Sequence, residues 1–351
     1  MPSPVDISAN DLTKDLVELL NIPSPTGYCA DAIRWASERL VSFGLQPKET
    51  AKGGLLVSLG GDESRPKRAL TAHVDTLGAM VKEILPNGRL RLRAIGGIIW
   101  NSVETEGCTV FCRNGRRLRG SLMIDRASAH VHGKEAGQRE RKAEHMELRL
   151  DERTQSAEDA AELGVSVGDF VAFDPRVEVS ESGFIRSRFL DDKAGVVCLL
   201  AAVKALRASG ESPVAPTWIH ISNYEEVGHG AAADLPEDLA ELIAVDMAAV
   251  GKGQASSEFE TTICLMDSGG PYHHGLSQHL RRLAEAKEIP HQVDMYPSYR
   301  SDGSAHWFAG GGAQVALMGP GIDASHNYER THQDSLVATT RLILAYLITE
   351  R

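Results

Sequence analysis

Aromatic side chains and long apolar runs are scarce in this chain. Phe, Trp and Tyr together make up 5% of its 351 residues. No stretch approaches the roughly 20 consecutive apolar residues that a membrane-spanning helix requires. Residues 1–15 also lack the basic segment and apolar run of a secretory signal peptide. We therefore predict a cytoplasmic protein with no membrane partner.

Positive charge and cysteine are also in short supply. The chain carries 37 Lys and Arg residues against 48 Asp and Glu residues, which gives a formal net charge of −11. This acidic balance argues against nucleic acid or an anionic membrane as the main partner. The five cysteines are an odd number in a long chain, and they predict reduced, mostly buried thiols rather than a disulfide framework.

The rest of the composition is that of an ordinary globular protein. Apolar residues make up 42% and charged residues 24%, which excludes a mainly disordered or collagen-like chain. No internal repeat or low-complexity tract is present. At about 150 residues per domain, the length predicts roughly two domains.

Strand-like and helix-like segments alternate in the first and last parts of the chain. Apolar spacing predicts helices over residues 12–20, 33–41, 194–208, 277–288 and 336–348, and strands at 55–59, 68–72, 217–222, 242–245, 261–265 and 314–318. Such alternation is typical of a mostly parallel central sheet with helices on both faces, that is, an α/β fold. Ligands of these sheets bind beyond the carboxyl ends of the strands.

The middle third of the chain has a different pattern. Residues 80–85 and 89–93 read as a β-hairpin, with Asn87-Gly88 supplying the positive φ angles of the turn. Further short alternating runs follow, and the charged stretch at 132–153 is expected to be a solvated excursion. We therefore predict a discontinuous catalytic domain formed by residues 1–82 and 187–351, with an inserted β-barrel-like domain over 83–186.

Acidic and imidazole side chains recur where the predicted strands end. They are His73 and Asp75 after the strand at 68–72, Asp191 and Asp192 before the helix at 194–208, Glu225 and Glu226 after 217–222, Asp246 after 242–245, and His326 beyond 314–318. Alone, each has an ordinary structural explanation, such as helix capping or a solvated surface. Together they indicate a divalent metal site, because neutral imidazole and carboxylate are the ligands that Zn²⁺ and similar ions prefer.

These segments resemble family forty-two of the metallopeptidases, the di-metal aminopeptidases that assemble into tetrahedral particles and are also described as glutamyl aminopeptidases or endoglucanases. The matching segments, in order, are AHVDTLG at 72–78, LDDKAG at 190–195, EEVG at 225–228, VD at 245–246 and SH at 325–326. Residues 22–28, IPSPTGY, resemble the family's N-terminal signature. The resemblance runs over nearly the whole chain and implies a di-zinc aminopeptidase-like fold.

The resemblance implies two divalent metal ions per subunit. Zn²⁺ is the expected metal, with Co²⁺ or Mn²⁺ as alternatives. Asp191 would bridge the two ions. His73 and Asp246 would complete one site, and Glu226 and His326 the other.

Catalytic roles follow from the same resemblance. Glu225 would be the general base that activates a water bridging the two ions. Asp75 would orient His73 from behind. Asp302 lies where the family places an aspartate near the active site, and we expect it to contribute to substrate binding.

Three positions depart from the usual family pattern and concern substrate preference. Thr76 replaces a common Glu, Tyr224 replaces a common Gln, and His229-Gly230 follows the EEVG segment in place of the usual residues. None of these changes removes an expected ligand. The variants resemble a bacterial subgroup linked to synthesis of a dipeptide-type osmoprotectant, N-acetylglutaminylglutamine amide.

The expected function is hydrolysis of N-terminal residues from short peptides. In the family, the inserted domain pairs subunits, and the dimers build a hollow particle of twelve subunits, so we expect a homo-oligomer of this kind. One alternative is an amide hydrolase or deacylase that uses the same metal site on a small dipeptide-like metabolite. Others are a glycoside hydrolase, which needs two carboxylates but no paired histidine ligands, and a non-catalytic assembly protein.

Overall fold

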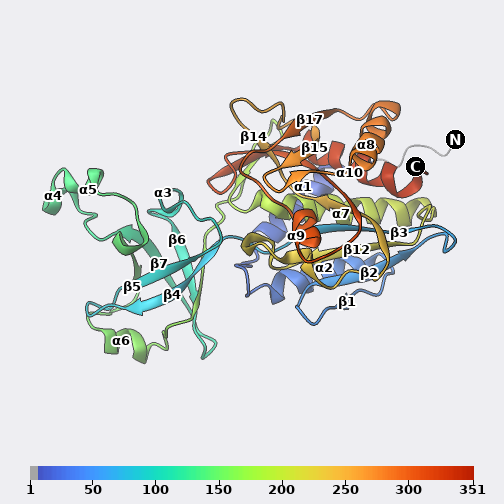
Figure 1. The fold of residues 1–351 in the computed structure, drawn as a ribbon. Helices are drawn as coiled ribbons and strands as arrows, with labels where there is room; N and C mark the ends of the chain where they lie inside the picture. The colour runs from blue at the N-terminus through green and yellow to red at the C-terminus, as the bar shows by residue number, and fades with distance from the viewer. Residues whose placement is uncertain (1–6) are drawn as a thin grey trace. The chain divides into compact units, whose positions relative to one another are not determined.

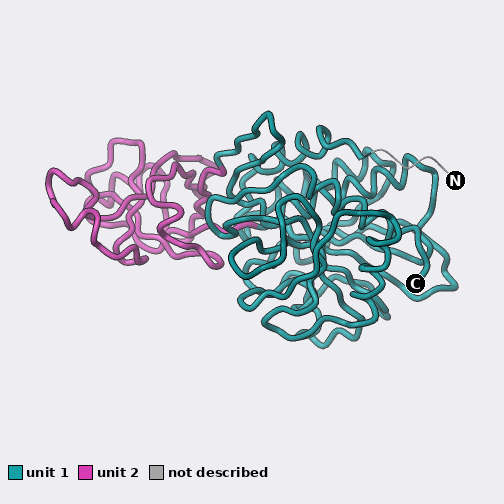
Figure 2. Tube along the Cα trace, turned by 90° about the horizontal axis from the view of Figure 1, so that it is seen from above, with its two compact units in different colours: residues 1–75, 176–351 teal, residues 76–175 magenta. Residues whose placement is uncertain are grey.

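The computed structural model describes residues 7–351, which form two compact units (Figures 1 and 2). The first unit contains the chain up to Asp75 and from Arg176 onward, and the second contains Thr76–Pro175. The boundaries expected from the sequence, after residues 82 and 186, fall inside the strands β4 (Gly78–Ile84) and β11 (Phe184–Ser187). β4 pairs within the second unit and β11 within the first, so the division lies several residues earlier at both places.

A large mixed sheet forms the centre of the first unit. Its four central strands are parallel neighbours in the order β12 (Thr217–Ser222), β3 (Lys67–His73), β13 (Leu239–Val245) and β18 (Gln314–Asp323). The remaining strands are β1 (Lys48–Glu49), β2 (Leu55–Gly60), β10 (Glu178–Val179), β11, β14 (Ala248–Val250), β15 (Thr261–Asp267), β16 (Gly270–Pro271), β17 (His291–Met295) and β19 (Glu329–His332). Burial is nearly continuous along β3 and β13, which confirms that both faces of the central sheet are covered.

Amphipathic and fully buried helices cover this sheet. They are α1 (Ala9–Leu20), α2 (Ala30–Ser42), α7 (Leu190–Ser209), α8 (His274–Ala286), α9 (Asp302–Phe308) and α10 (Gln333–Ile348). In α1 the leucines at helical spacing are buried, and the Ser8 side chain caps the helix by accepting from the amide of Asp11 at 3.2 Å. α7 is apolar on nearly all sides because it packs against α1, α10 and β3. Within the described residues, no helix combines the length and apolar character needed to cross a bilayer.

The second unit is a closed β-barrel, as the sequence pattern indicated. Its strands are arranged in the order β4, β5 (Leu90–Ile95), β8 (Met146–Leu150), β7 (Arg117–Ile124), β6 (Gly107–Phe111) and β9 (Phe170–Phe173). The predicted hairpin is present as β4 and β5. Gly88 in its turn has a φ of +78°, a conformation that glycine adopts without steric cost. Short helices lie in the connections between the barrel strands: α3 (Trp100–Val103), α4 (Ala129–His132), α5 (Glu135–Gln138) and α6 (Ala157–Glu162).

The expectation of a solvated excursion over 132–153 was wrong for its second half. Residues 146–150 form β8, which pairs with both β5 and β7 and closes the barrel. Met146 and Leu148 are fully buried, whereas Arg149 between the apolar positions points outward. Three alternating apolar residues were enough to make a barrel strand, although charged neighbours masked them in the sequence.

Candidate metal centre

The predicted metal-binding side chains gather at the carboxyl edge of the central sheet. β3 ends at His73, and Ser222, the last residue of the neighbouring β12, lies beside it in register. Glu225 and Glu226 follow β12 in the short helix η2 (Glu225–Val227), and Asp246 directly follows β13. The first turn of α7 contributes Asp191, and His326 lies just beyond β18. Parallel neighbouring strands therefore bring the predicted groups to one place, as expected.

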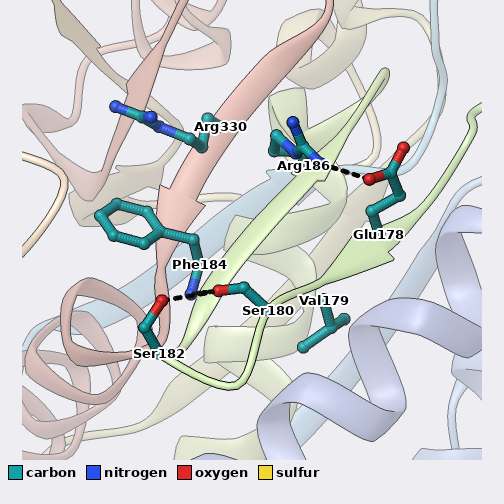
Figure 3. Close-up of a pocket in the computed structure, with 7 residues that line it drawn as sticks. All are labelled: Glu178, Val179, Ser180, Ser182, Phe184, Arg186 and Arg330. Carbon is teal, nitrogen blue, oxygen red and sulfur yellow. Dashed lines mark hydrogen bonds and ion pairs between the residues drawn. The ribbon is translucent and has the colours of Figure 1, made fainter.

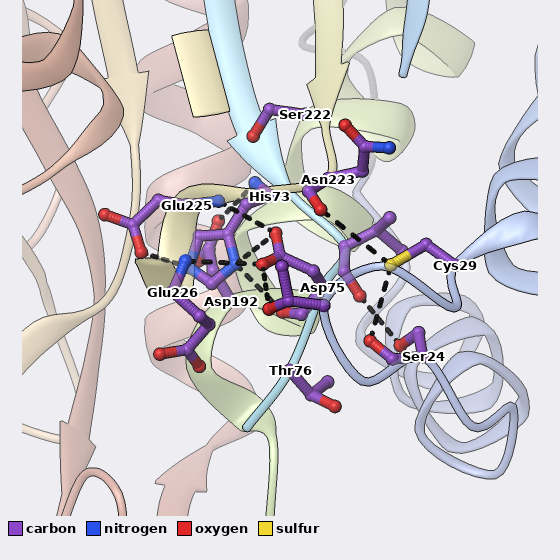
Figure 4. A network of polar contacts seen from close by, with 12 residues as sticks. Ser24, Cys29, His73, Asp75, Thr76, Asp192, Ser222, Asn223, Glu225 and Glu226 are labelled. Carbon is purple, nitrogen blue, oxygen red and sulfur yellow. Dashed lines mark hydrogen bonds and ion pairs between the residues drawn. The ribbon is translucent and has the colours of Figure 1, made fainter. Parts of the chain in front are cut away.

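The two histidines face a shared carboxylate. His73 Nε2 lies 3.2 Å from Asp191 Oδ1, and His326 Nε2 lies 3.5 Å from Asp191 Oδ2. On the His73 side, Nε2 is 3.6 Å from Glu225 Oε2 and 3.9 Å from Asp246 Oδ1. On the other side, His326 Nε2 is 3.6 Å from Glu226 Oε2. Figure 4 shows the carboxylate of Glu225 directed toward the His73 ring.

Two groups of three side chains have the composition and spacing of metal-ligand sets. His73, Asp192 and Asp246 form one group, and Asp191, Glu226 and His326 form the other, with the donor atoms of each group within 4.8 Å of one another. Imidazole with carboxylates suits Zn²⁺ and related divalent ions. The first group is buried, whereas in the second group the His326 side chain is 34% exposed.

The first group contains Asp192, whereas the family resemblance of the sequence implied Asp191 beside His73 and Asp246. Its carboxylate already accepts two main-chain hydrogen bonds, from the amide of His73 at 3.3 Å and from the amide of Gly195 at 3.1 Å. Asp191, in contrast, points both of its oxygens at imidazole nitrogens. The geometry therefore gives Asp192 a role in holding His73 and α7, and leaves Asp191 facing both histidines.

Carboxyl groups are concentrated at this centre. Burial raises the pKa of Asp192, Glu225 and Glu226 well above the usual range, and raises that of Asp246 to about 7. The positive charges that counter this effect come from His73 and His326. Although burial opposes it, hydrogen bonding to Asp191 holds the pKa of His73 well above its ordinary value and that of His326 at about 10. So many carboxyl groups in one buried cluster fit a pair of divalent cations.

Asp75 is fully buried behind His73. Its Oδ1 accepts a hydrogen bond from the amide of Glu225 at 3.1 Å, and its Oδ2 accepts from the amide of Glu226 at 3.3 Å and from the Thr26 hydroxyl at 2.6 Å. Asp75 Oδ1 also lies 3.6 Å from His73 Nδ1, whose nearer partner is the main-chain oxygen of Asp75 at 3.0 Å. Asp75 thus fixes His73 through its main-chain oxygen and the pair of glutamates through its carboxylate (Figure 4).

Asp302 lies at the first turn of α9, with 3% of its surface exposed. Its Oδ1 accepts from the amide of Ala231 at 2.7 Å, and its Oδ2 accepts from the Ser222 hydroxyl and, at 3.4 Å, from the Thr71 hydroxyl. Ser222 and Ala231 bracket the loop that carries Glu225 and Glu226. The carboxylate expected to meet substrate is therefore engaged by protein donors at both ends of that loop.

Glu329 is a site residue that the sequence did not reveal. It is buried in β19, where its Oε1 accepts from the amide of His326 at 3.0 Å and its Oε2 accepts from the amide of Asp191 at 3.2 Å. Burial raises its pKa to about 8. The available signal was a glutamate three residues after His326, but an isolated glutamate in a polar segment is typical of solvated surface.

A separate pocket lies between β10, β11 and β19 (Figure 3). Its lining residues are Glu178, Val179, Ser180, Ser182, Phe184, Arg186 and Arg330. Arg186 pairs with Glu178, and Arg330 makes two hydrogen bonds to Glu258 at 2.7 and 2.8 Å. Because acidic partners neutralise both guanidinium groups, this pocket offers neither a metal-ligand set nor a free positive charge for an anion.

Comparison with known proteins assigns the chain to a family. The model of the M42 glutamyl aminopeptidases matches residues 53–342, a range that contains every group of the metal centre. The chain belongs to this family. It is therefore a peptide hydrolase, and the family resemblance drawn from its motifs is confirmed, as is the α/β fold with an inserted barrel.

Curated members of the family match over nearly the full length. YhfE of Bacillus subtilis, provisionally named an aminopeptidase, is 45% identical over 336 residues, which cover 95% of this chain and 97% of YhfE. The glutamyl aminopeptidase of Lactococcus lactis is 27% identical over 348 residues, covering 95% of this chain and 96% of that protein.

Solved structures share the fold at lower sequence identity. An aminopeptidase from Desulfurococcus kamchatkensis superposes with a TM-score of 0.87 at 21% identity, covering 97% of this chain and 96% of that one. The Pyrococcus horikoshii TET1 peptidase, described as assembling into a tetrahedron or a large octahedral shell, gives a TM-score of 0.84 at 24% identity, covering 97% of this chain and all of that one.

Proposed function

We propose that this family member is a dinuclear, metal-dependent aminopeptidase that removes N-terminal residues from short peptides. The observation that carries the proposal is the orientation of Asp191, whose Oδ1 and Oδ2 lie 3.2 Å and 3.5 Å from the imidazoles of His73 and His326. A carboxylate with this orientation suits two cations held about 3.5–4 Å apart.

The ligand sets follow from this orientation. Asp191 would be the shared ligand, with His73 and Asp246 holding one ion and Glu226 and the more exposed His326 holding the other. Zn²⁺ is the metal we expect, with Co²⁺ and Mn²⁺ as alternatives that the same donors accept. When bound, the two cations polarise the scissile carbonyl and lower the pKa of the attacking water.

Glu225 is the general base in this proposal. Its side chain is 14% exposed, compared with 4% for that of Glu226, and its Oε2 stands 3.6 Å from His73 Nε2. Burial raises its pKa, which suits a carboxyl group that takes a proton from water and delivers it to the leaving amine. The hydrogen bond from its amide to Asp75 holds the backbone in place, so adjacent Glu226 can ligate while Glu225 faces substrate.

An acidic centre also favours a peptide N-terminus as the substrate end. The protonated α-amino group is attracted by the surplus of carboxylates, whereas an internal peptide bond carries no such charge. Tyr224 and His229, two of the positions that depart from the family pattern, stack with ring centroids 5.1 Å apart beside Glu225, and Lys52 lies over the Tyr224 ring. We expect this stack to influence which N-terminal residue is preferred.

A substrate panel with metal reconstitution tests the proposal. Protein freed of metal by chelation is assayed with Zn²⁺, Co²⁺ or Mn²⁺ on aminoacyl anilides, on short peptides and on the same peptides with an acetylated N-terminus. We expect metal-dependent cleavage of the free peptides and little cleavage of the acetylated ones. Preference for the acetylated peptides would instead indicate the amide hydrolase that the same centre could support.

We further propose that the chain forms a homo-oligomer, with dimers paired through the barrel building a particle of twelve subunits. Structural relatives described as a dodecamer and as a tetrahedron support this assembly. We also propose a cytoplasmic location, which is supported by five buried cysteines that are all free thiols.

A further inference from the structure

Three tyrosines lie in or against one apolar cluster of the first unit, and two of them have satisfied hydroxyl groups. Tyr272 donates to Asp267 Oδ2 at 2.7 Å and lies 2.7 Å from the Ser301 hydroxyl. The Tyr296 hydroxyl pairs with the Ser256 hydroxyl at 2.9 Å. Both tyrosines are buried in one apolar cluster of the first unit, so each contributes to the core in the ordinary way.

Tyr299, which packs against the same cluster, is different. Its hydroxyl oxygen is buried, yet within residues 7–351 it has no hydrogen-bond partner. The residue is nevertheless held firmly. Its main-chain carbonyl accepts from the amide and the hydroxyl of Ser268 at 3.0 and 2.7 Å, and its ring packs edge-on against Tyr296 with centroids 5.3 Å apart. A fixed, buried hydroxyl without a partner requires an explanation, because most buried polar groups are paired.

The surroundings of this hydroxyl supply the explanation. Burial raises the pKa of Tyr299 well above its ordinary value, and the nearby charges of Asp246, Asp191 and Glu225 add to this effect. The hydroxyl in turn lowers the pKa of Asp246, although the geometry between them does not complete a hydrogen bond. A fixed hydroxyl without a protein partner therefore stands beside the expected general base and two of the expected metal ligands.

We propose that Tyr299 is a further catalytic residue, whose hydroxyl donates a hydrogen bond to the carbonyl oxygen of the scissile peptide bond as that oxygen gains negative charge. This inference rests on the proposed function.

In the reaction, the water oxygen bonds to the carbonyl carbon, the π electron pair moves to the carbonyl oxygen, and Glu225 takes one proton of the water. The carbonyl then re-forms, the carbon–nitrogen bond breaks, and the leaving amine receives the proton from Glu225. Tyr299 keeps its own proton throughout and stabilises the charged oxygen.

The conservative variant Tyr299→Phe tests this role, with Tyr296→Phe as a matched control three residues away. Tyr296→Phe removes a hydroxyl of the same cluster that already has a protein partner. The full-length, metal-loaded proteins are compared for kcat, KM, metal content and thermal stability. The affinity of an α-aminophosphonic acid, whose tetrahedral oxygens resemble the attacked carbonyl, is measured by calorimetry beside that of the free amino acid.

We expect Tyr299→Phe to lower kcat by about 10²-fold with little change in KM and with two metal ions retained. Affinity for the aminophosphonic acid should fall by a similar factor, while affinity for the free amino acid stays unchanged. Tyr296→Phe should change neither kcat nor affinity for the aminophosphonic acid. Unchanged kcat and phosphonate affinity in Tyr299→Phe would overturn the inference.

Two other outcomes also have a defined meaning. If Tyr299→Phe loses metal and weakens both ligands equally, the hydroxyl only positions Asp246, and the catalytic role is overturned. Failure of the wild-type protein to cleave any free peptide counts against the proposed function instead. In that case calorimetry with the aminophosphonic acid still decides the role of Tyr299, because it requires no turnover.

Discussion

The main-chain amide of Asp191 donates a hydrogen bond to the buried carboxylate of Glu329 at 3.2 Å. The other oxygen of the same carboxylate accepts from the amide of His326 at 3.0 Å. Glu329 thus joins the backbones of two residues whose side chains face each other at the centre. His326 has a φ of +64°, a left-handed conformation that is uncommon for residues other than glycine and is stabilised by support from neighbouring groups. Glu329 supplies that support.

Replacing Glu329 with Gln should loosen the metal site on the His326 side. Glutamine offers one acceptor oxygen where glutamate offers two, so one of the two amides loses its partner. We expect affinity for one of the two ions to fall by about 10–100-fold, as when groups that orient ligands are removed. Metal analysis after dialysis should give two ions for the wild type and close to one for the variant.

Asp294→Asn is the matched control for this prediction. Asp294 also accepts several main-chain amides, those of Ala255, Ser256 and Met295, but it lies in β17. Its replacement should lower thermal stability without changing metal content. Two tightly held ions in Glu329→Gln, or a loss of metal in Asp294→Asn, would contradict the role assigned to Glu329.

Glu225→Gln should separate catalysis from metal binding. The change removes the proton acceptor and leaves the neighbouring ligands intact, so we expect turnover to fall by about 10²-fold or more at nearly unchanged metal content. The adjacent Glu226→Gln serves as the comparison, because it should lose metal as well as activity. Assays combined with metal analysis check both variants, and a Glu225→Gln enzyme that keeps most of its activity would show that the base has been misassigned.

The metal-free protein should lose stability as the pH rises from about 5 to about 8. In the metal-free fold, burial raises the pKa of Asp246 to about 7 and that of Glu329 to about 8, whereas carboxyl groups of an unfolded chain titrate near 4. The folded protein then binds more protons than the unfolded chain over this range, so its free energy of unfolding decreases with pH. Melting curves of chelator-treated protein at several pH values measure this slope.

Stabilisation of the protein by added metal should show the opposite dependence on pH, because it depends on the same carboxylates. Deprotonated ligands bind cations better, so added Zn²⁺ should raise the melting temperature more at pH 8 than at pH 5. The raised pKa of His326, about 10, acts in the same direction, because its proton also competes with metal. A metal-free protein that gains stability between pH 5 and 8 would count against this account of the centre.

The sequence predicted where the proposed ligands at the ends of strands lie, because the topology of a parallel sheet determines those positions. His73 is the last residue of one buried strand and Asp246 directly follows another, and parallel neighbours bring such ends together whatever the loops do. Roles that depend on main-chain orientation could not be predicted in this way. Glu329 and Asp302 act on amides of distant loops, and a sequence does not show where an amide points. Tyr299 lacked a signal altogether, because its unpaired hydroxyl is a property of the folded cluster.

The strands of the barrel show a similar limit. The hairpin of β4 and β5 was visible because Asn87-Gly88 encodes its turn locally. β8 was missed because its pairing with β5 and β7 is long-range, and its three apolar residues lie within a charged stretch. Likewise β11, a short run near the insertion, joins the large sheet through β19, a partner more than 140 residues away in the chain.

The last prediction concerns assembly through the barrel. Several large apolar side chains of the barrel unit are exposed, among them Ile99 at 43% and Val167 at 67%, and we expect the assembly to cover them. Light scattering should give a mass twelve times that of the 37.9 kDa chain, or twice the mass of the chain if only the dimer forms.

Ile99→Asp and Val167→Asp together should lower the mass of the particle, because a charge resists burial in an apolar contact. Val179→Asp, at a 49% exposed position in β10 of the first unit, is the control and should leave the mass unchanged. Each subunit carries the complete set of proposed metal ligands, so the dissociated variant should still cleave short peptides. A dominant mass near 37.9 kDa for the fully active wild type would refute the assembly while leaving the catalytic proposal intact.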